Sequence, residues 1–225
     1  MLLRLATLTA VLSSTVAFGQ QGPLEHQGQA WGLITGTGHL QPSKRVRWYA
    51  EVQSRIGLTD RRFNLLLLRA ALGFDIGAGW SVWLGNGWVP SFNPSYRSEL
   101  RPWLQVSGEH TVAPGFRVIN RSRFEVRFLD NAQGISVRVR HMVRAVYKLG
   151  DSPYSLVASD ELFVTVNKVT GGPAQGLDQN RLFIGASRSF GVPVLEVGYL
   201  ATYVWRSPAP RLSHTALVWL AFNFP

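Results

Sequence analysis

FRVINRSRFEVRFLDNAQGISVRVRHMVRAVYK, residues 116–148, consists of two runs in which charged and apolar residues alternate. The two runs are joined by LDNAQG at 129–134. In the first run the charged residues occupy odd positions from Arg117 to Arg127, and most even positions are apolar. In the second run the charged positions are even, from Arg138 to Lys148. Successive side chains of a β-strand point to opposite faces, so each run has one charged face and one apolar face. The stretch therefore predicts two neighbouring β-strands.

The length of these runs indicates a membrane environment. Strands of soluble proteins usually have roughly five or six residues, whereas a tilted strand needs about 9–11 residues to cross a bilayer. Membrane-spanning barrel strands also alternate apolar lipid-facing residues with polar lumen-facing ones. We therefore expect an all-β fold, a single transmembrane antiparallel up-and-down β-barrel whose apolar face meets lipid.

The same alternation recurs along the chain, for example at 45–56, where Arg47 and Glu51 share one parity. Eleven segments have the pattern of a strand, the first at 31–37 and the fifth at 99–106. Bacterial single-chain barrels have an even number of strands, so we expect 12 strands, with 10 as the alternative. Pro102 lies inside the fifth segment and conflicts with an uninterrupted strand there, because proline cannot donate a ladder hydrogen bond.

Residues 1–19 have the features of a secretory signal peptide. Arg4 precedes an apolar core that ends near Val16, and small residues lie before a cut after Gly19. The alternative is a membrane anchor, but the apolar core is too short to span a bilayer as a helix. We expect cleavage after Gly19, export to the bacterial outer membrane, and one barrel domain over residues 20–225. No later segment has the apolar length of a transmembrane helix, which excludes a helical membrane protein.

The amino-acid composition excludes several classes of protein and of binding partner. The chain has 225 residues, a net charge of +10 and no cysteine, which excludes disulfide scaffolds and thiolate metal sites. Strong basicity often indicates nucleic-acid binding. Here the arginines lie on alternate strand positions instead of clustering in one helix or loop, and the chain is expected to be exported. We therefore expect no nucleic-acid partner.

The last segment, residues 212–224, is similar to the C-terminal sorting strand of outer-membrane barrels, except that Pro225 follows Phe224. Aromatic residues on apolar parities would supply the interfacial girdles of such a barrel. They are Trp48, Trp80, Trp88, Tyr199 and Tyr203.

Three short motifs carry a resemblance to a known family. LRAALGF at 68–74, NRLFIG at 180–185 and LEVGYL at 195–200 resemble the DUF2490 family of uncharacterised bacterial proteins. The resemblance covers most of the expected mature chain. It implies an outer-membrane β-barrel, and it implies no activity.

The charged parities define the candidate lumen wall. We expect the following residues to line it: Arg47, Glu51, Arg69, Arg121, Arg123, Glu125, Arg138, Arg140, Arg144 and Arg181. Arginine and lysine outnumber glutamate on these parities, so pairing alone cannot neutralise the wall. Two interpretations remain open: a polar network that fills a narrow barrel, and a cation-rich wall that favours anions.

Catalytic signals are sparse. Ser213 and His214 are adjacent and point to opposite faces of a strand, so they cannot form a nucleophile–base dyad. His141 falls on an apolar parity, which predicts an interface position or a break in strand register. The sequence contains no metal-ligand spacing, phosphate loop or Gly-x-Ser-x-Gly elbow. We therefore expect no catalytic residue, no metal and no cofactor.

These features favour a passive outer-membrane barrel, either a narrow anion-leaning channel or a plugged structural barrel. Its expected partners are outer-membrane lipid, lipopolysaccharide and small anionic solutes, and the sequence does not define its oligomeric state. The alternatives are a periplasmic lipocalin-like binder of a small ligand and an outer-membrane lipid-modifying enzyme. The binder requires extraction without detergent, and the enzyme requires a serine or histidine beside a carboxylate.

Overall fold

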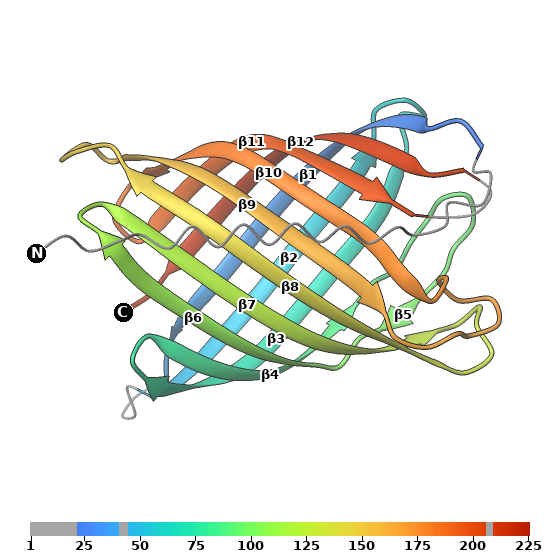
Figure 1. The fold of residues 1–225 in the computed structure, drawn as a ribbon, viewed down its shortest axis with the longest axis horizontal. Coiled ribbons are helices and arrows are strands. Elements are labelled where there is room, and N and C mark those ends of the chain that lie inside the picture. The colour runs from blue at the N-terminus through green and yellow to red at the C-terminus, as the bar shows by residue number, and fades with distance from the viewer. Residues whose placement is uncertain (1–21, 41–44, 206–208) are drawn as a thin grey trace, which may run out of the picture.

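The computed structural model describes residues 22–40, 45–205 and 209–225. In these residues every regular element is a β-strand, and the strands form one closed ring (Figure 1). The described residues contain no helix that is long and apolar enough to cross a membrane. The expected signal peptide, residues 1–19, lies outside the described residues.

Eleven long strands follow one another around the ring, and one two-residue strand lies in line with one of them, between the same two neighbours. Their bounds are β1 (Glu25–His39), β2 (Val46–Gly57), β3 (Phe63–Gly77), β4 (Trp80–Trp88), β5 (Glu99–Leu100), β6 (Trp103–Ala113), β7 (Phe116–Leu129), β8 (Ile135–Lys148), β9 (Tyr154–Thr165), β10 (Gly176–Ser189), β11 (Pro193–Val204) and β12 (Arg211–Asn223). The long strands have 9 to 15 residues, the lengths that the alternating runs predict.

The ring closes through a parallel pair. β1 and β12 run in the same direction, with Trp31 opposite Leu217, whereas the other strand pairs are antiparallel. The structure has twelve strands, as expected, but β5 and β6 lie in line between β4 and β7 and share one position, so the ring has eleven. An up-and-down path with an odd number of strands brings its first and last strands together in the same direction. The expectation of antiparallel pairing throughout was wrong at this closing pair.

Pro102 accounts for the short strand β5. The segment expected to form one strand over 99–106 divides into β5 and β6, and β6 begins directly after the proline. Proline has no N–H to donate to a ladder, but its carbonyl still accepts a hydrogen bond from the Val126 N–H at 3.0 Å. Pairing resumes at Trp103, opposite Glu125 of β7.

Side chains alternate between the inside and the outside of the ring, as the charge pattern predicts. In β7, Arg123 and Glu125 are 3% and 0% exposed, whereas Phe124 is 44% exposed. Among the expected girdle residues, Trp80 and Trp88 are also exposed on the outer face. The exterior is therefore mainly apolar, and the interior holds most of the charge.

Two apolar clusters also lie inside the ring. One consists of Trp31, Val146, Val157, Phe183, Leu200 and Leu217, and the other of Ala71, Trp83 and Trp103. Gly85 of β4 makes room for the second cluster, because a Cβ at this position would lie 2.3 Å from the Trp103 ring. The interior is thus packed by rings as well as by ion pairs.

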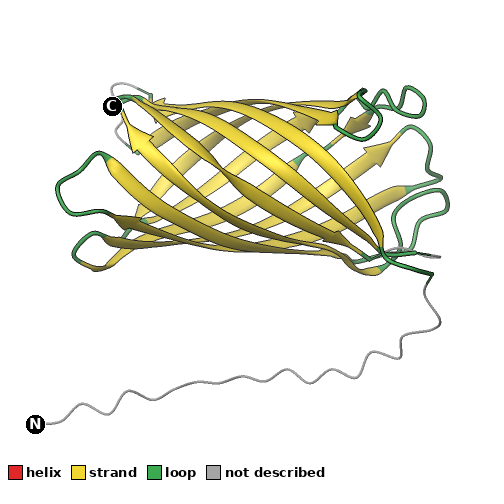
Figure 2. Cartoon of the chain, turned by 90° about the horizontal axis from the view of Figure 1, so that it is seen from above, coloured by secondary structure: helices red, strands yellow, loops and turns green. Residues whose placement is uncertain are grey.

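The two ends of the ring differ in their connections (Figure 2). Residues 78–79, 114–115, 149–153 and 190–192 form short connections at one end, here called the turn end. At the other end, called the loop end, residues 89–98 and 166–175 form the longest connections. β1 begins at the loop end, and β12 finishes at the turn end, near the C-terminus marked in Figure 1.

Cysteine cross-linking can test the parallel closure, because the chain has no cysteine of its own. Ala30 lies opposite Ala216, and Ile34 lies opposite Leu220, across the β1–β12 pair. We expect disulfides in both the A30C/A216C and the I34C/L220C variants, because paired strands hold Cα atoms within the reach of a disulfide, about 4.4–6.8 Å. Non-reducing electrophoresis of the refolded protein measures their formation. The A30C/L220C variant should stay open, and cross-linking of this pair alone would contradict the parallel register.

Candidate functional site

All ten residues predicted to line the lumen lie on inward-facing positions of β2, β3, β7, β8 and β10. Within the described residues, most of these positions line two interior cavities. The loop-side cavity, of about 360 Å³, is lined by seven of the ten: Glu51, Arg69, Arg121, Arg138, Arg140, Arg144 and Arg181. The turn-side cavity, of about 610 Å³, is lined by three of them: Arg47, Arg121 and Arg123. Glu125 is fully buried between its arginine partners.

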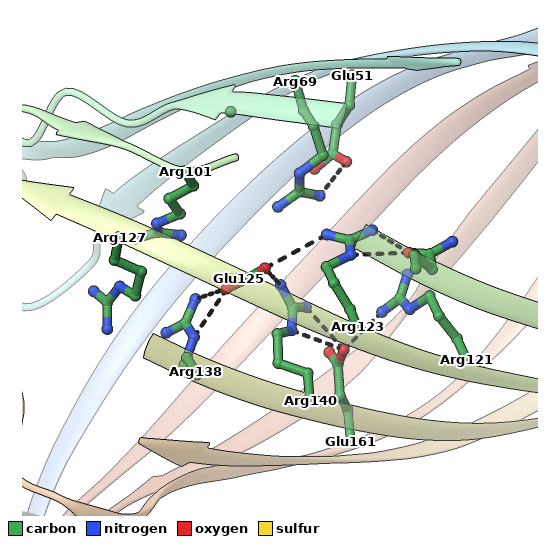
Figure 3. Close-up of polar contacts among 12 residues, drawn as sticks. Glu51, Arg69, Arg101, Arg121, Arg123, Glu125, Arg127, Arg138, Arg140 and Glu161 are labelled. Atoms are coloured by element: carbon green, nitrogen blue, oxygen red, sulfur yellow. Dashed lines mark hydrogen bonds and ion pairs between the residues drawn. The ribbon is translucent and has the colours of Figure 1, made fainter. Parts of the chain in front are cut away.

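Glu125 is the centre of the interior charge network (Figure 3). Arg138 donates to its carboxylate from Nε and Nη2, at 2.9 and 2.5 Å. Arg140 donates from Nη1 at 2.7 Å, and the Arg123 Nη1 lies 3.7 Å away. One buried carboxylate on β7 therefore holds three guanidinium groups, two of them from the adjacent strand β8.

Glu161 of β9 extends the network around the wall. Its Oε1 accepts hydrogen bonds from Arg140 Nη2 at 2.8 Å and from Arg121 Nη2 at 2.7 Å. Arg140 thus bridges Glu125 and Glu161, as Figure 3 shows. Glu125 lies directly opposite Arg138 on the neighbouring strand, whereas Arg140 reaches Glu161 on a diagonal. The bidentate geometry of arginine suits such carboxylate partners.

The remaining carboxylates inside the barrel also have arginine partners. Arg69 contacts Glu51 at 2.6 Å. Arg144 of β8 pairs with Glu196 of β11, with β9 and β10 between them in the ring. In the loop-side half, Glu99 accepts from both Arg101 and Arg127. Each of these carboxylates is thus ion-paired with at least one guanidinium.

Two inward arginines differ from the rest. Arg55 and Arg181 form no ion pair within the described ranges, and both line the loop-side cavity. The Arg55 guanidinium lies 3.7 Å from the centre of the Trp31 ring, and that of Arg181 lies 5.1 Å from the same ring. Arg181 also lies 4.5 Å from the Phe163 ring. Aromatic faces take the place of carboxylates here.

Sequence reasoning missed these interior rings. It placed aromatic residues mainly in outer girdles, yet Trp31, Trp83 and Phe163 are buried inside. The sequence did contain a signal for Phe163. It lies two residues after Glu161, and side chains two residues apart in a β-strand point to the same face. Conversely, Arg117 lies on the charged parity but is not in the lumen. It pairs with Glu109 at the turn end, where both side chains are 49% exposed.

The outer face carries polar residues in hydrogen-bonded pairs. Ser122 and His141 lie opposite each other on β7 and β8, with the hydroxyl 2.9 Å from Nδ1. No register shift occurs there, so the predicted break at His141 was wrong. Among the described residues, no carboxylate bonds to His141, and Asp160 is held by Asn180. Ser213 points inward and is 3% exposed.

No group of histidines and carboxylates within the described ranges is arranged to hold a metal ion. What the interior offers is a set of guanidinium donors around cavities of small-molecule size. The fold and this interior define the protein as a closed β-barrel with an arginine-rich, partly hollow core.

The chain belongs to the family described as "Protein of unknown function (DUF2490)", whose model matches residues 28–213. It is similar to an uncharacterized protein of Methylorubrum extorquens, with 29% identity over 202 residues, which cover 88% of this chain and 87% of that relative. No solved structure matches the chain. The family expected from the sequence motifs is therefore confirmed.

The central role of Glu125 predicts a large stability difference between two glutamates. E125Q leaves buried guanidiniums without their shared counter-charge, so we expect it to lower the free energy of unfolding by about 3–5 kcal/mol. E109Q removes the partner of Arg117 at an exposed site and should cost less than about 1 kcal/mol. Denaturant unfolding of the refolded barrel measures both values. Equal effects of the two substitutions would contradict the central role of Glu125.

Proposed function

We propose that the protein is an outer-membrane β-barrel whose apolar outer face lies in lipid. The support is the exposure of large apolar side chains around the ring, such as Leu72, Leu84 and Ile184, at 58%, 63% and 60%. Soluble monomers rarely expose contiguous apolar patches larger than a few hundred Å². Strands of 9 to 15 residues also suffice to cross a bilayer when tilted.

This location predicts the behaviour of the mature chain, residues 20–225. It should require detergent for extraction from cells and, once refolded, should float with lipid vesicles in a density gradient, because its outer face is apolar. It should also migrate differently in gels before and after boiling. A chain that is extracted without detergent and does not float would contradict a membrane location and favour a periplasmic small-ligand binder.

We further propose that the barrel acts passively as a narrow, anion-leaning channel. The observation that carries this proposal is the charge imbalance of the loop-side cavity, which is lined by ten arginines and four carboxylates. Glu99 and Glu125 add two more carboxylates behind this lining, and arginine remains in excess. Rings of arginine or lysine favour anions over cations in pores.

A specific observation favours a second candidate, the plugged structural barrel. The two cavities meet at Tyr49, Arg121 and Trp219, where the ion-paired layer around Glu125 crosses the interior. Arg123 and Arg140 in this layer are 3% and 6% exposed. This ion-paired layer narrows the route between the two cavities. Ion conduction through the barrel therefore depends on gaps in the layer.

Planar-bilayer recordings separate these two candidates. Wild-type protein should show conductance steps and prefer chloride to potassium in a salt gradient. In R123S/R140S the preference should shift towards potassium, because two positive charges leave the layer while Glu125 and Glu161 remain. Reversal potential measures the shift, and boiling-dependent gel mobility verifies folding.

The matched control is K148S, which removes a positive charge from an exposed position at the turn end. Its selectivity should equal that of the wild type. If R123S/R140S also keeps the wild-type selectivity, Arg123 and Arg140 do not determine it. A folded wild-type barrel without any conductance would favour the plugged structure.

A further inference from the structure

Arg55 and Arg181 enclose one end of the loop-side cavity on two sides of Trp31. Arg55 lies on β2, directly opposite Trp31 of β1 in the strand register. Arg181 lies on β10, which is reached in the other direction around the ring, past β12 and β11. Two cations from distant parts of the chain are thus brought to one aromatic ring.

Both guanidiniums have unused hydrogen-bonding capacity. The Nε of Arg55 and the Nε of Arg181 are buried and have no hydrogen-bond partner. A buried donor without an acceptor is costly, and native structures rarely leave such groups unpaired. Because both side chains also line the loop-side cavity, an acceptor in that cavity would meet two guanidiniums whose hydrogen-bonding capacity is not fully used.

The neighbouring carboxylates are already engaged. Glu161 lies directly opposite Arg181 on β9, but its carboxylate is bonded to Arg121 and Arg140. Asp178, at the start of β10, lies 3.4 Å from Arg138. Within the described part of the chain, the neighbouring carboxylates thus form ion pairs with the surrounding arginines and not with Arg55 or Arg181.

Aromatic rings position the two guanidiniums: Arg55 lies over Trp31, and Arg181 lies near both Trp31 and Phe163. Arginine on an aromatic face keeps its N–H edge free for planar, bidentate contacts with oxygen atoms. The two guanidinium carbons are separated by at most the sum of their distances from the ring centre, about 9 Å. An oxyanion that accepts an N–H···O bond of about 2.9 Å at each side can bridge such a gap.

We propose that Arg55 and Arg181 form a binding site for a small oxyanion of the phosphate type, entered from the loop end. Pro173, in the long β9–β10 connection, also lines the cavity, so the cavity extends to the loop end. The volume of about 360 Å³ is near the lower limit for small-molecule sites, about 300–1,000 Å³, which limits the ligand to compact anions. The site deepens the proposed function, since it names the anion class that the lumen would hold.

Isothermal titration calorimetry of the refolded, detergent-solubilised barrel with inorganic phosphate tests this site at low ionic strength. Wild-type protein should bind phosphate saturably. R55Q and R181Q should each weaken binding by at least about tenfold, because each removes charge-assisted hydrogen bonds. The R55Q/R181Q double variant should show no saturable binding.

R188Q is the matched control. Arg188 also lies over aromatic rings, Tyr154 at 5.3 Å and Phe190 at 4.6 Å, and it forms no ion pair in the described part of the chain. It is exposed and does not line the cavity. Its substitution should leave phosphate affinity unchanged.

The outcomes for the site and for the channel are separable. Absent phosphate binding in the wild type, or retained binding in the folded double variant, would overturn the site even if the barrel conducts chloride. Saturable binding that depends on both arginines would establish the site even if the bilayer recordings show no conductance. Gel mobility before and after boiling verifies that each variant is folded.

Discussion

The parallel pairing of β1 with β12 is the constraint on which the rest of the structure depends. Without it, both strands would be free edges with unpaired N–H and C=O groups, and water would enter the interior through the gap. Interior ion pairs are strengthened by the exclusion of water, because Coulomb attraction grows as the local dielectric falls. The closure of the ring and the charge network around Glu125 therefore stabilise each other.

Within the closed ring, a shortage of carboxylates shapes the interior. Glu125 and Glu161 each serve more than one arginine, which is the economical arrangement when positive groups are in excess. Other guanidiniums lie over aromatic rings, as Arg123 does over Trp103 at 4.1 Å. Cation–π contact compensates a buried cation only in part. The interior therefore stays basic, and this residual charge is the physical basis for the proposed affinity for anions.

The outer face differs from the interior in the partners of its polar side chains. Some of its polar side chains are bonded to one another, as Ser122 is to His141, and Asp160 to Asn180. In an apolar medium an unpaired polar group is costly, so paired groups are what a lipid-facing wall requires. The Ser122–His141 pair also lies within a continuous β7–β8 ladder.

Much of the wall was predictable from the sequence because the direction of a side chain is a local property of a strand. Parity alone placed Arg123, Glu125 and Arg140 inside, and Phe124 outside. The partner of each charge was not predictable, since Arg144 meets Glu196 only after the ring has closed. The same holds for the approach of Arg55 and Arg181 to Trp31, and for the parallel closure, in which the first and last strands meet only when the ring closes. The sequence thus determined which residues face the interior. Only the tertiary structure decided which of them meet, because those contacts join strands that are far apart in the chain.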